Sequence, residues 1–149
     1  MLRELENMCM DDSFDIARAE ELLKTIDINQ EFISSKHQLP DTFLDLAACS
    51  ANIKMVKLLL EKGADPNLIY DNGSENVLWN LQYADGINDS ENNLRLEIVK
   101  LLLEHGANPR LKIEEELLNW AICYNIEEDE GIQREYRGKF ICLLEDYDK

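Results

Sequence analysis

Carboxylates are the most abundant chemically active side chains in this sequence, and their spacing argues against catalysis. The chain has 31 Asp and Glu residues against 15 Lys and Arg, which gives a net charge of −16. Runs such as 114–116 and 127–130 usually form a solvated face. The segments 85–91 and 127–131 are similar in composition to calcium loops, but they lack the alternating ligands and the later bidentate glutamate. We therefore expect no catalytic carboxylate pair, no metal site and no cofactor.

The cysteines and histidines form no reactive or metal-binding pattern either. The chain has no C-x-x-C motif, and His37 and His105 have no Cys or His neighbour at the spacing of zinc ligands. Cys49 and Cys123 lie within apolar helical patterns, as buried thiols do. Phosphate-binding glycine loops and nucleophile motifs are also missing from the sequence. These observations predict a protein that is not an enzyme and that keeps its cysteines reduced, as in the cytoplasm.

The surplus of negative charge restricts the partners that the chain can bind. It is spread along the sequence, so no segment offers the Lys and Arg cluster that DNA, RNA or an anionic membrane requires. The N-terminus lacks a secretory signal, and no apolar run approaches the roughly 18–20 residues of a membrane span. We expect a cytoplasmic protein that binds neither nucleic acid nor membrane. A basic protein would be attracted, although the acidic residues could equally serve solubility alone.

The elements that must position the polar side chains are paired helices. Residues 53–60 carry an apolar stripe at helical spacing, formed by Ile53, Val56, Leu59 and Leu60. Gly63 follows this stripe and can adopt the left-handed conformation that ends a helix. A shorter helix is expected at about 43–50, where small residues allow close packing. Because neither helix can bury its stripe alone, successive pairs must stack on one another.

Self-similarity supports this stacking and carries a resemblance to the ankyrin repeat. The leucine-rich helix recurs near residues 94–104, and the Gly-Ala-Asp-Pro-Asn turn that follows it recurs in part as Gly-Ala-Asn-Pro at 106–109. Thr42, Leu44 and Ala47 match the family's T-P-L-H-x-A signature, whereas Phe43 and Asp45 replace its Pro and His. The resemblance implies an all-α ankyrin-repeat solenoid of about four helix pairs. It also implies turn fingers that project from one side, and atypical capping repeats at both ends.

We expect one ankyrin-repeat domain over residues 1–149 with irregular repeats. Gly63 and Gly106 are 43 residues apart, which exceeds the family period of ~33 and predicts enlarged acidic loops on one side of the solenoid. The expected parts are an N-terminal cap at 1–36 with helices at 2–10 and about 15–25, a repeat at 37–70, a repeat at 71–110 with an insertion at 85–93, and a degenerate C-terminal repeat at 111–149 with an insertion at 125–138.

The resemblance further implies a concave binding face, formed by the first helices of the repeats and by the finger tips. Aromatic anchors with a polar rim suit such an interface. Trp79 takes the position of Asp45 and could instead pack beneath the loop 85–93, whereas Trp120 is expected in the core. The predicted partner-binding residues are Asp45, Tyr70, Asp71, Asn72, Trp79, Tyr83, Asp85, Asp89, Tyr124, Glu127, Glu128, Asp129 and Glu130.

The function predicted from these features is a non-enzymatic protein interaction module, monomeric on its own, that binds a basic protein through an acidic concave face and enlarged loops. Two alternatives remain open. Its size, charge and irregular repeats resemble those of bacterial immunity proteins that neutralise a basic toxin such as a nuclease. The chain could also be an inhibitory or accessory subunit of an enzyme, which would use the same kind of surface.

Overall fold

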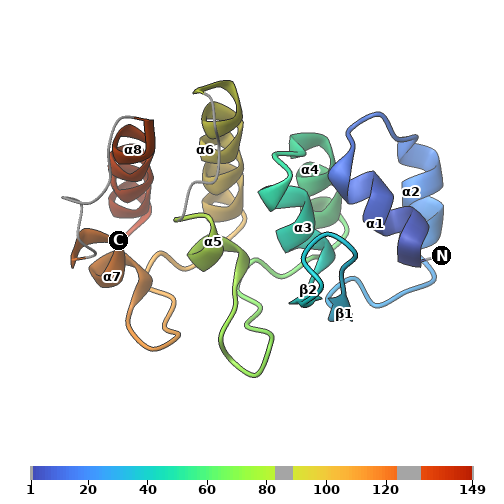
Figure 1. Ribbon diagram of the computed structural model, residues 1–149, viewed down its shortest axis with the longest axis horizontal. Coiled ribbons are helices and arrows are strands. Elements are labelled where there is room, and N and C mark those ends of the chain that lie inside the picture. The colour runs from blue at the N-terminus through green and yellow to red at the C-terminus, as the bar shows by residue number, and fades with distance from the viewer. Residues whose placement is uncertain (1, 83–88, 124–131, 149) are drawn as a thin grey trace.

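The computed structural model describes residues 2–82, 89–123 and 132–148, and these form a row of packed helix pairs (Figure 1). The helices are α1 (Leu2–Met10), α2 (Ile16–Leu23), α3 (Phe43–Cys49), α4 (Ile53–Glu61), α5 (Val77–Asn80), α6 (Asp89–Glu104), α7 (Leu117–Cys123) and α8 (Ile132–Tyr147). The predicted all-α repeat solenoid of four helix pairs is confirmed. The borders proposed for the individual repeats stay a prediction.

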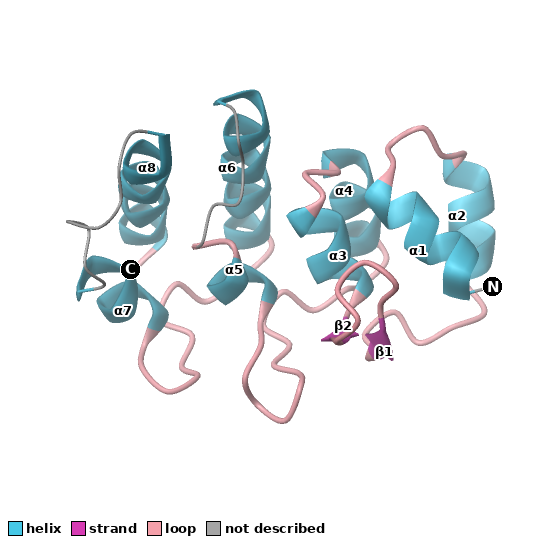
Figure 2. Cartoon of the chain, in the orientation of Figure 1, coloured by secondary structure: helices cyan, strands magenta, loops and turns pink. Residues whose placement is uncertain are grey.

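The segments that precede α3, α5 and α7 project from the same side of the row as loops or a hairpin (Figure 2). The first of them contains two short antiparallel strands, β1 (Phe32–Ile33) and β2 (Pro40–Asp41). The second is closed by a bridge between Tyr70 and Glu75. We call β1–β2 and the residues between them the hairpin, and residues 70–75 the finger.

Capping side chains fix where the helices begin. Thr42 Oγ1 accepts a hydrogen bond of 3.2 Å from the Asp45 backbone N–H at the start of α3. Asn76 Oδ1 accepts hydrogen bonds from the first turn of α5, and its amide also donates to the carbonyl of Pro66 at 3.0 Å. Each cap satisfies backbone donors that a helix end otherwise leaves open. The Asn76 cap thereby also connects the start of α5 to the backbone at Pro66, upstream of the finger.

One apolar core runs through all the helix pairs. Leu46, Met55, Ile98 and Phe140 come from four different helices and are at most 1% exposed. A polar contact also joins α8 to the end of α5, because the Tyr136 hydroxyl donates to the Leu81 carbonyl at 2.6 Å. Since the core is continuous, the hairpin and the finger are held by the whole stack rather than by one repeat.

The turns that end the second helices are linked to one another by asparagine side chains. Gly63 and Gly106 have φ values of 98° and 92°, and the value at Gly63 confirms the left-handed helix end predicted there. Asn67 Oδ1 accepts a 2.7 Å hydrogen bond from the Asn108 backbone N–H, and Asn29 Oδ1 accepts one of 2.9 Å from that of Asp65. These bonds set the spacing between successive repeats.

The structure corrects the predicted insertions and adds strands that the sequence did not indicate. Helix α6 begins at Asp89 and α8 at Ile132, so the predicted loops at 85–93 and 125–138 overlap helical residues. The first turn of α6 is polar, so it carries no apolar stripe that would mark it as helical. The rest of both predicted loops lies outside the described residues. The strands β1 and β2 have two residues each, too few for a periodic signal.

None of the helices in the described ranges combines the length and the apolarity that crossing a membrane requires.

Two glycines allow a test of the turn geometry against helix propensity. Gly63→Ala should lower the free energy of unfolding by about 1–2 kcal/mol, because φ is positive there and an L residue is strained in that conformation. No atom lies within 4 Å of the added Cβ, so a steric clash adds nothing to this cost. Gly138→Ala lies inside α8 in similarly open space and should raise stability by up to ~1 kcal/mol. Urea unfolding measures both, and equal signs for the two variants would contradict the role of Gly63.

Candidate partner-binding site

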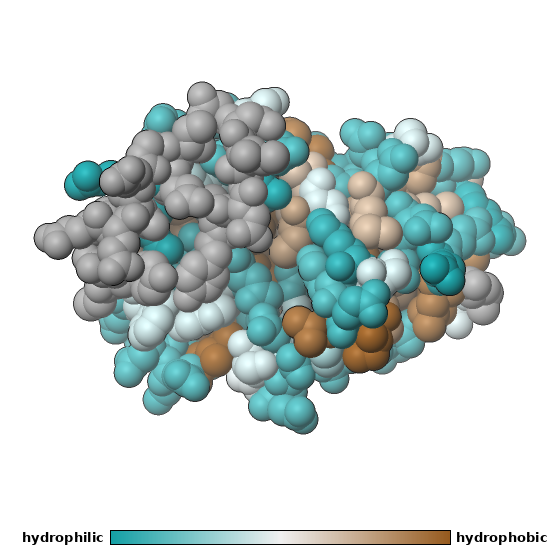
Figure 3. All heavy atoms as spheres, viewed as in Figure 1, coloured by the Kyte–Doolittle hydropathy of each residue, from teal (hydrophilic) through white to brown (hydrophobic). Residues whose placement is uncertain are grey.

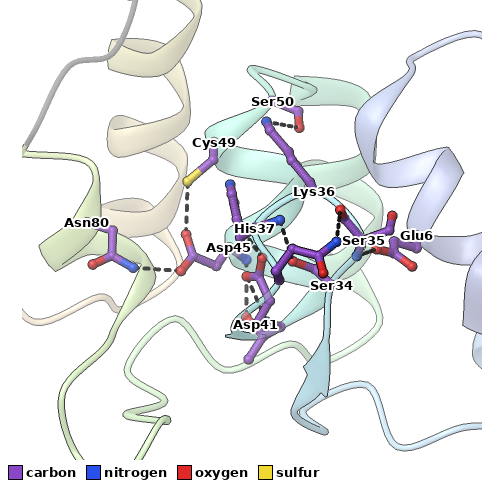
Figure 4. A network of polar contacts seen from close by, with 12 residues as sticks. Glu6, Ser34, Ser35, Lys36, His37, Asp41, Asp45, Cys49, Ser50 and Asn80 are labelled. Atoms are coloured by element: carbon purple, nitrogen blue, oxygen red, sulfur yellow. Dashed lines mark hydrogen bonds and ion pairs between the residues drawn. The ribbon is translucent and has the colours of Figure 1, made fainter.

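The candidate site begins with Asp45, a carboxylate buried between two repeats. Its side chain is 3% exposed and lies on α3. The Tyr70 hydroxyl and the Asn80 amide both donate to Asp45 Oδ2, the amide at 2.7 Å, and the Cys49 thiol donates to Oδ1 at 3.2 Å. Figure 4 shows Asp45 between Cys49 and Asn80. The carboxylate therefore joins α3, the finger and α5 at one point.

Electrostatics at this point work against the charge of Asp45. Burial, together with the nearby charges of Asp41 and Glu75, raises the pKa of Asp45 to about 6, although the bonds from Cys49 and Asn80 act in the opposite direction. Burial also raises the pKa of the Cys49 thiol well above its usual value. Cys49 is thus a protonated donor at neutral pH and lacks the activation of a nucleophile.

The hairpin is fixed to the helices on both sides by polar contacts. His37 Nδ1 lies 2.7 Å from Asp41 Oδ2, and Asp41 Oδ1 accepts a 3.0 Å bond from the Thr42 backbone N–H at the start of α3. On the other side, the Ser35 hydroxyl donates to the Glu6 carboxylate of α1 at 2.8 Å. Lys36 donates to Ser50 at 3.1 Å (Figure 4). The hairpin is consequently anchored at its base and along its loop.

A pocket of about 240 Å³ opens between the hairpin, α3, the finger and α5. We call it the acidic pocket, because its charged lining consists of Asp41, Asp45, Asp71 and Glu75, with His37 and Arg95 as the basic groups. Leu39, Pro40 and Leu81 supply apolar wall. Arg95 Nη2 donates to the Cys49 carbonyl at 3.1 Å, and Nη1 lies 3.7 Å from Glu91. The arginine is therefore engaged with the protein, and the pocket keeps a surplus of negative charge.

The predicted residues of the finger divide into a buried base and an accessible tip. Tyr70 is 5% exposed because its hydroxyl reaches Asp45, so it lies at the base rather than at the predicted tip. Asp71 and Asn72 have φ values of 51° and 56°, as a tight turn requires, and form the tip. Asn72 is exposed and Asp71 half-buried. Their role in binding stays a prediction.

The two tryptophans form an aromatic pair between neighbouring repeats. Trp79 of α5 and Trp120 of α7 are stacked, with ring centroids 6.0 Å apart and an angle of 29° between the planes. Both are half-buried, so Trp120 is less enclosed than predicted, and Trp79 is partly packed on the core. Such a pair contributes to packing between repeats. The predicted role of Trp79 in partner binding stays a prediction.

The other predicted site residues lie at or beyond the edges of the described ranges. Asp89 begins α6, but its side chain lies outside the described residues. The remaining ones also lie outside them: Tyr83, Asp85, Tyr124, Glu127, Glu128, Asp129 and Glu130.

The structure adds residues to the site that the sequence did not indicate. Leu39, Glu75, Asn80 and Arg95 all line the acidic pocket. Asn80 lies one residue after the predicted Trp79, on an adjacent face of the same short helix, so only the position of Asp45 in space reveals its role. Within the described residues, no three His, Cys, Asp or Glu side chains are grouped to hold a metal ion.

Comparison with known families agrees with this geometry. The sequence profile of the family described as Ankyrin repeat matches residues 41–71 and 81–113. The first match contains α3, α4 and the start of the finger, and the second contains α6. No curated protein matches the chain.

The buried carboxylate predicts a pH dependence of stability that Asp45→Asn removes. Because the folded-state pKa of about 6 lies above the ordinary 3.8, the folded protein retains a proton on Asp45 between these two pH values, where the unfolded chain releases it. Stability is therefore lost as pH rises from about 4 to 6, by up to about 3 kcal/mol. The difference in the free energy of unfolding between Asp45→Asn and the wild type should therefore shift in favour of the variant between pH 4 and pH 7. Urea unfolding at both pH values measures this shift. The exposed Asp12→Asn is the control, and a pH-independent difference for Asp45→Asn would contradict the argument.

Proposed function

Because the chain belongs to the ankyrin-repeat family, whose repeats generally act as protein–protein interaction modules, we propose that it is a non-enzymatic module that binds a basic protein. The acidic pocket carries this proposal. Four carboxylates line it, against one arginine and one histidine. A surface of this kind attracts Lys and Arg side chains and disfavours anionic partners.

The net charge of −16 supports the same conclusion at longer range. A strongly acidic protein attracts a basic partner before contact and increases the rate of association, more so at low ionic strength. The predicted acidic loop at 127–130 would add to this field, although its residues lie outside the described part of the chain. We expect the chain to act as a monomer until it meets its partner.

The chemistry of the described side chains favours binding over catalysis. Cys49 is the thiol nearest to the buried carboxylate, and its raised pKa keeps it protonated. His37 Nδ1 is engaged by Asp41, and the carboxylate of Asp45 is occupied by Tyr70 and Asn80. These groups satisfy one another, as structural groups do, and among the described bonds the imidazole ring of His37 contacts Asp41 and no hydroxyl or thiol.

The two more specific alternatives are versions of this proposal. An immunity protein and an inhibitory subunit would each bind a basic partner, and they differ only in what that partner does. Affinity capture from the source cells with mass-spectrometric identification would supply the partner. Its activity, alone and in complex with this chain, then separates a neutralised toxin from a regulated enzyme.

Charge removal at the finger tests the proposal once a captured partner is in hand. The double variant Asp71→Asn and Glu75→Gln should lower the association rate by about two- to five-fold at low salt and flatten its dependence on ionic strength. The double variant Glu61→Gln and Glu97→Gln is the matched control, because it removes two exposed carboxylates, on α4 and α6, that do not line the pocket. Stopped-flow or surface-based kinetics measure both. An equal effect of the control, or no partner with a basic surface, would refute the proposal.

A further inference from the structure

The hairpin exposes large apolar side chains that the core does not use. Ile33 is 66% and Leu39 61% exposed, the highest values among the exposed large hydrophobic residues that the structure describes. Figure 3 shows hydrophobic surface in the region where Figure 1 places the hairpin. Strand and loop residues of an anchored hairpin lose little freedom on binding, so these side chains are suited to contact another molecule.

A second cavity lies beside the acidic pocket. It has a volume of about 300 Å³, and Phe32, Ile33 and Pro40 form its apolar lining, so we call it the hairpin cavity. Its polar lining is Glu31, Asp71 and Asn72. Pro40 and Asp71 line both the hairpin cavity and the acidic pocket. The two cavities are therefore neighbours, with Pro40 of β2 and the finger tip between them.

The two cavities differ in what they can accept. The acidic pocket offers carboxylates together with an apolar wall of Leu39 and Leu81. This combination fits the long methylene stem and charged end of lysine or arginine better than it fits a bare ion. The hairpin cavity offers mainly apolar contact, with carboxylates only at its edge. It fits an uncharged aliphatic or aromatic side chain.

We propose that the hairpin and the finger form a two-part docking site for an extended segment of the partner, which carries a Lys or Arg beside a large apolar residue. The basic side chain enters the acidic pocket, and the apolar one enters the hairpin cavity and covers Ile33. Adjacent cavities favour an extended segment, because side chains two positions apart point to the same face of such a chain. This inference rests on the proposed function and adds to it the local chemistry of the partner.

The hairpin is rigid enough for this role. Asp41 is 2% exposed and connects the end of β2 to both His37 and the start of α3. The Ser35 side chain is bonded to Glu6 of α1. With both sides of its loop held, the hairpin presents Leu39 and Ile33 in a fixed position, so binding orders little of the protein.

Peptide titration of the full chain tests the docking site directly. The probe is a short capped Ser/Gly peptide with one leucine and one arginine two positions apart. Its binding is monitored in ¹H–¹⁵N correlation spectra of the labelled protein. We expect shifts of the backbone signals of Leu39, Asp71, Glu75 and Asn80. Replacing the peptide arginine by glutamate should abolish these shifts, and replacing its leucine by glycine should weaken binding by about five-fold or more.

Protein variants give the matched comparison. Leu39→Ser should weaken binding of the peptide and of the captured partner by about five-fold or more, whereas Ile16→Ser, at a residue that is 45% exposed on α2, should leave it unchanged. Shifts elsewhere on the chain, equal binding of the glutamate peptide, or equal effects of the two variants would overturn the docking site. If a basic partner binds and Leu39→Ser has no effect, the docking site fails but the proposed function stands. If no basic partner exists, the proposed function itself fails.

Discussion

No helix pair in this chain can bury its own apolar stripe, and this constraint determines the rest of the structure. The core is formed only when α3 and α4 pack against the pairs on either side, and it is almost free of solvent at Leu46, Met55 and Ile98. Because the helices are committed to stacking, the segments between them are left to project from one side. The hairpin, the finger and the pocket between them are therefore consequences of the repeat architecture.

The burial of Asp45 lowers the stability of the free protein when the carboxylate is ionised. The signature of the family has His at this position, and here a carboxylate receives bonds from Tyr70, Asn80 and Cys49. These donors hold the finger in place, but the neighbouring charges of Asp41 and Glu75 oppose ionisation. A basic group from a partner would relieve that repulsion, so the charge that is unfavourable in the free protein becomes favourable in a complex.

Local patterns predicted most of the helices, and contacts distant in sequence determined the rest. The pair α3–α4 follows from the apolar periodicity of residues 53–60 and from Gly63, signals that lie within neighbouring turns of the chain. The start of α8 was missed, although Tyr136 continues the stripe of Phe140 and Leu144 at intervals of four residues. No local signal marks the burial of Tyr70, which depends on a partner 25 positions away, or the pocket wall formed by Arg95 of α6.

Charge and apolar contact have different physical roles at the surface between the hairpin and the finger. Carboxylates act over about 8–10 Å at physiological salt and so bias the approach of a partner, but solvent-exposed ion pairs hold it weakly. Exposed apolar groups such as Ile33 act only in contact, where the removal of their area from water slows dissociation. A surface that places both kinds of group around Pro40 and Asp71 can therefore combine rapid association with a durable complex. The proposed docking site would select for the combination, because a partner that is only basic leaves the apolar groups exposed, and one that is only apolar brings no positive charge to the acidic pocket.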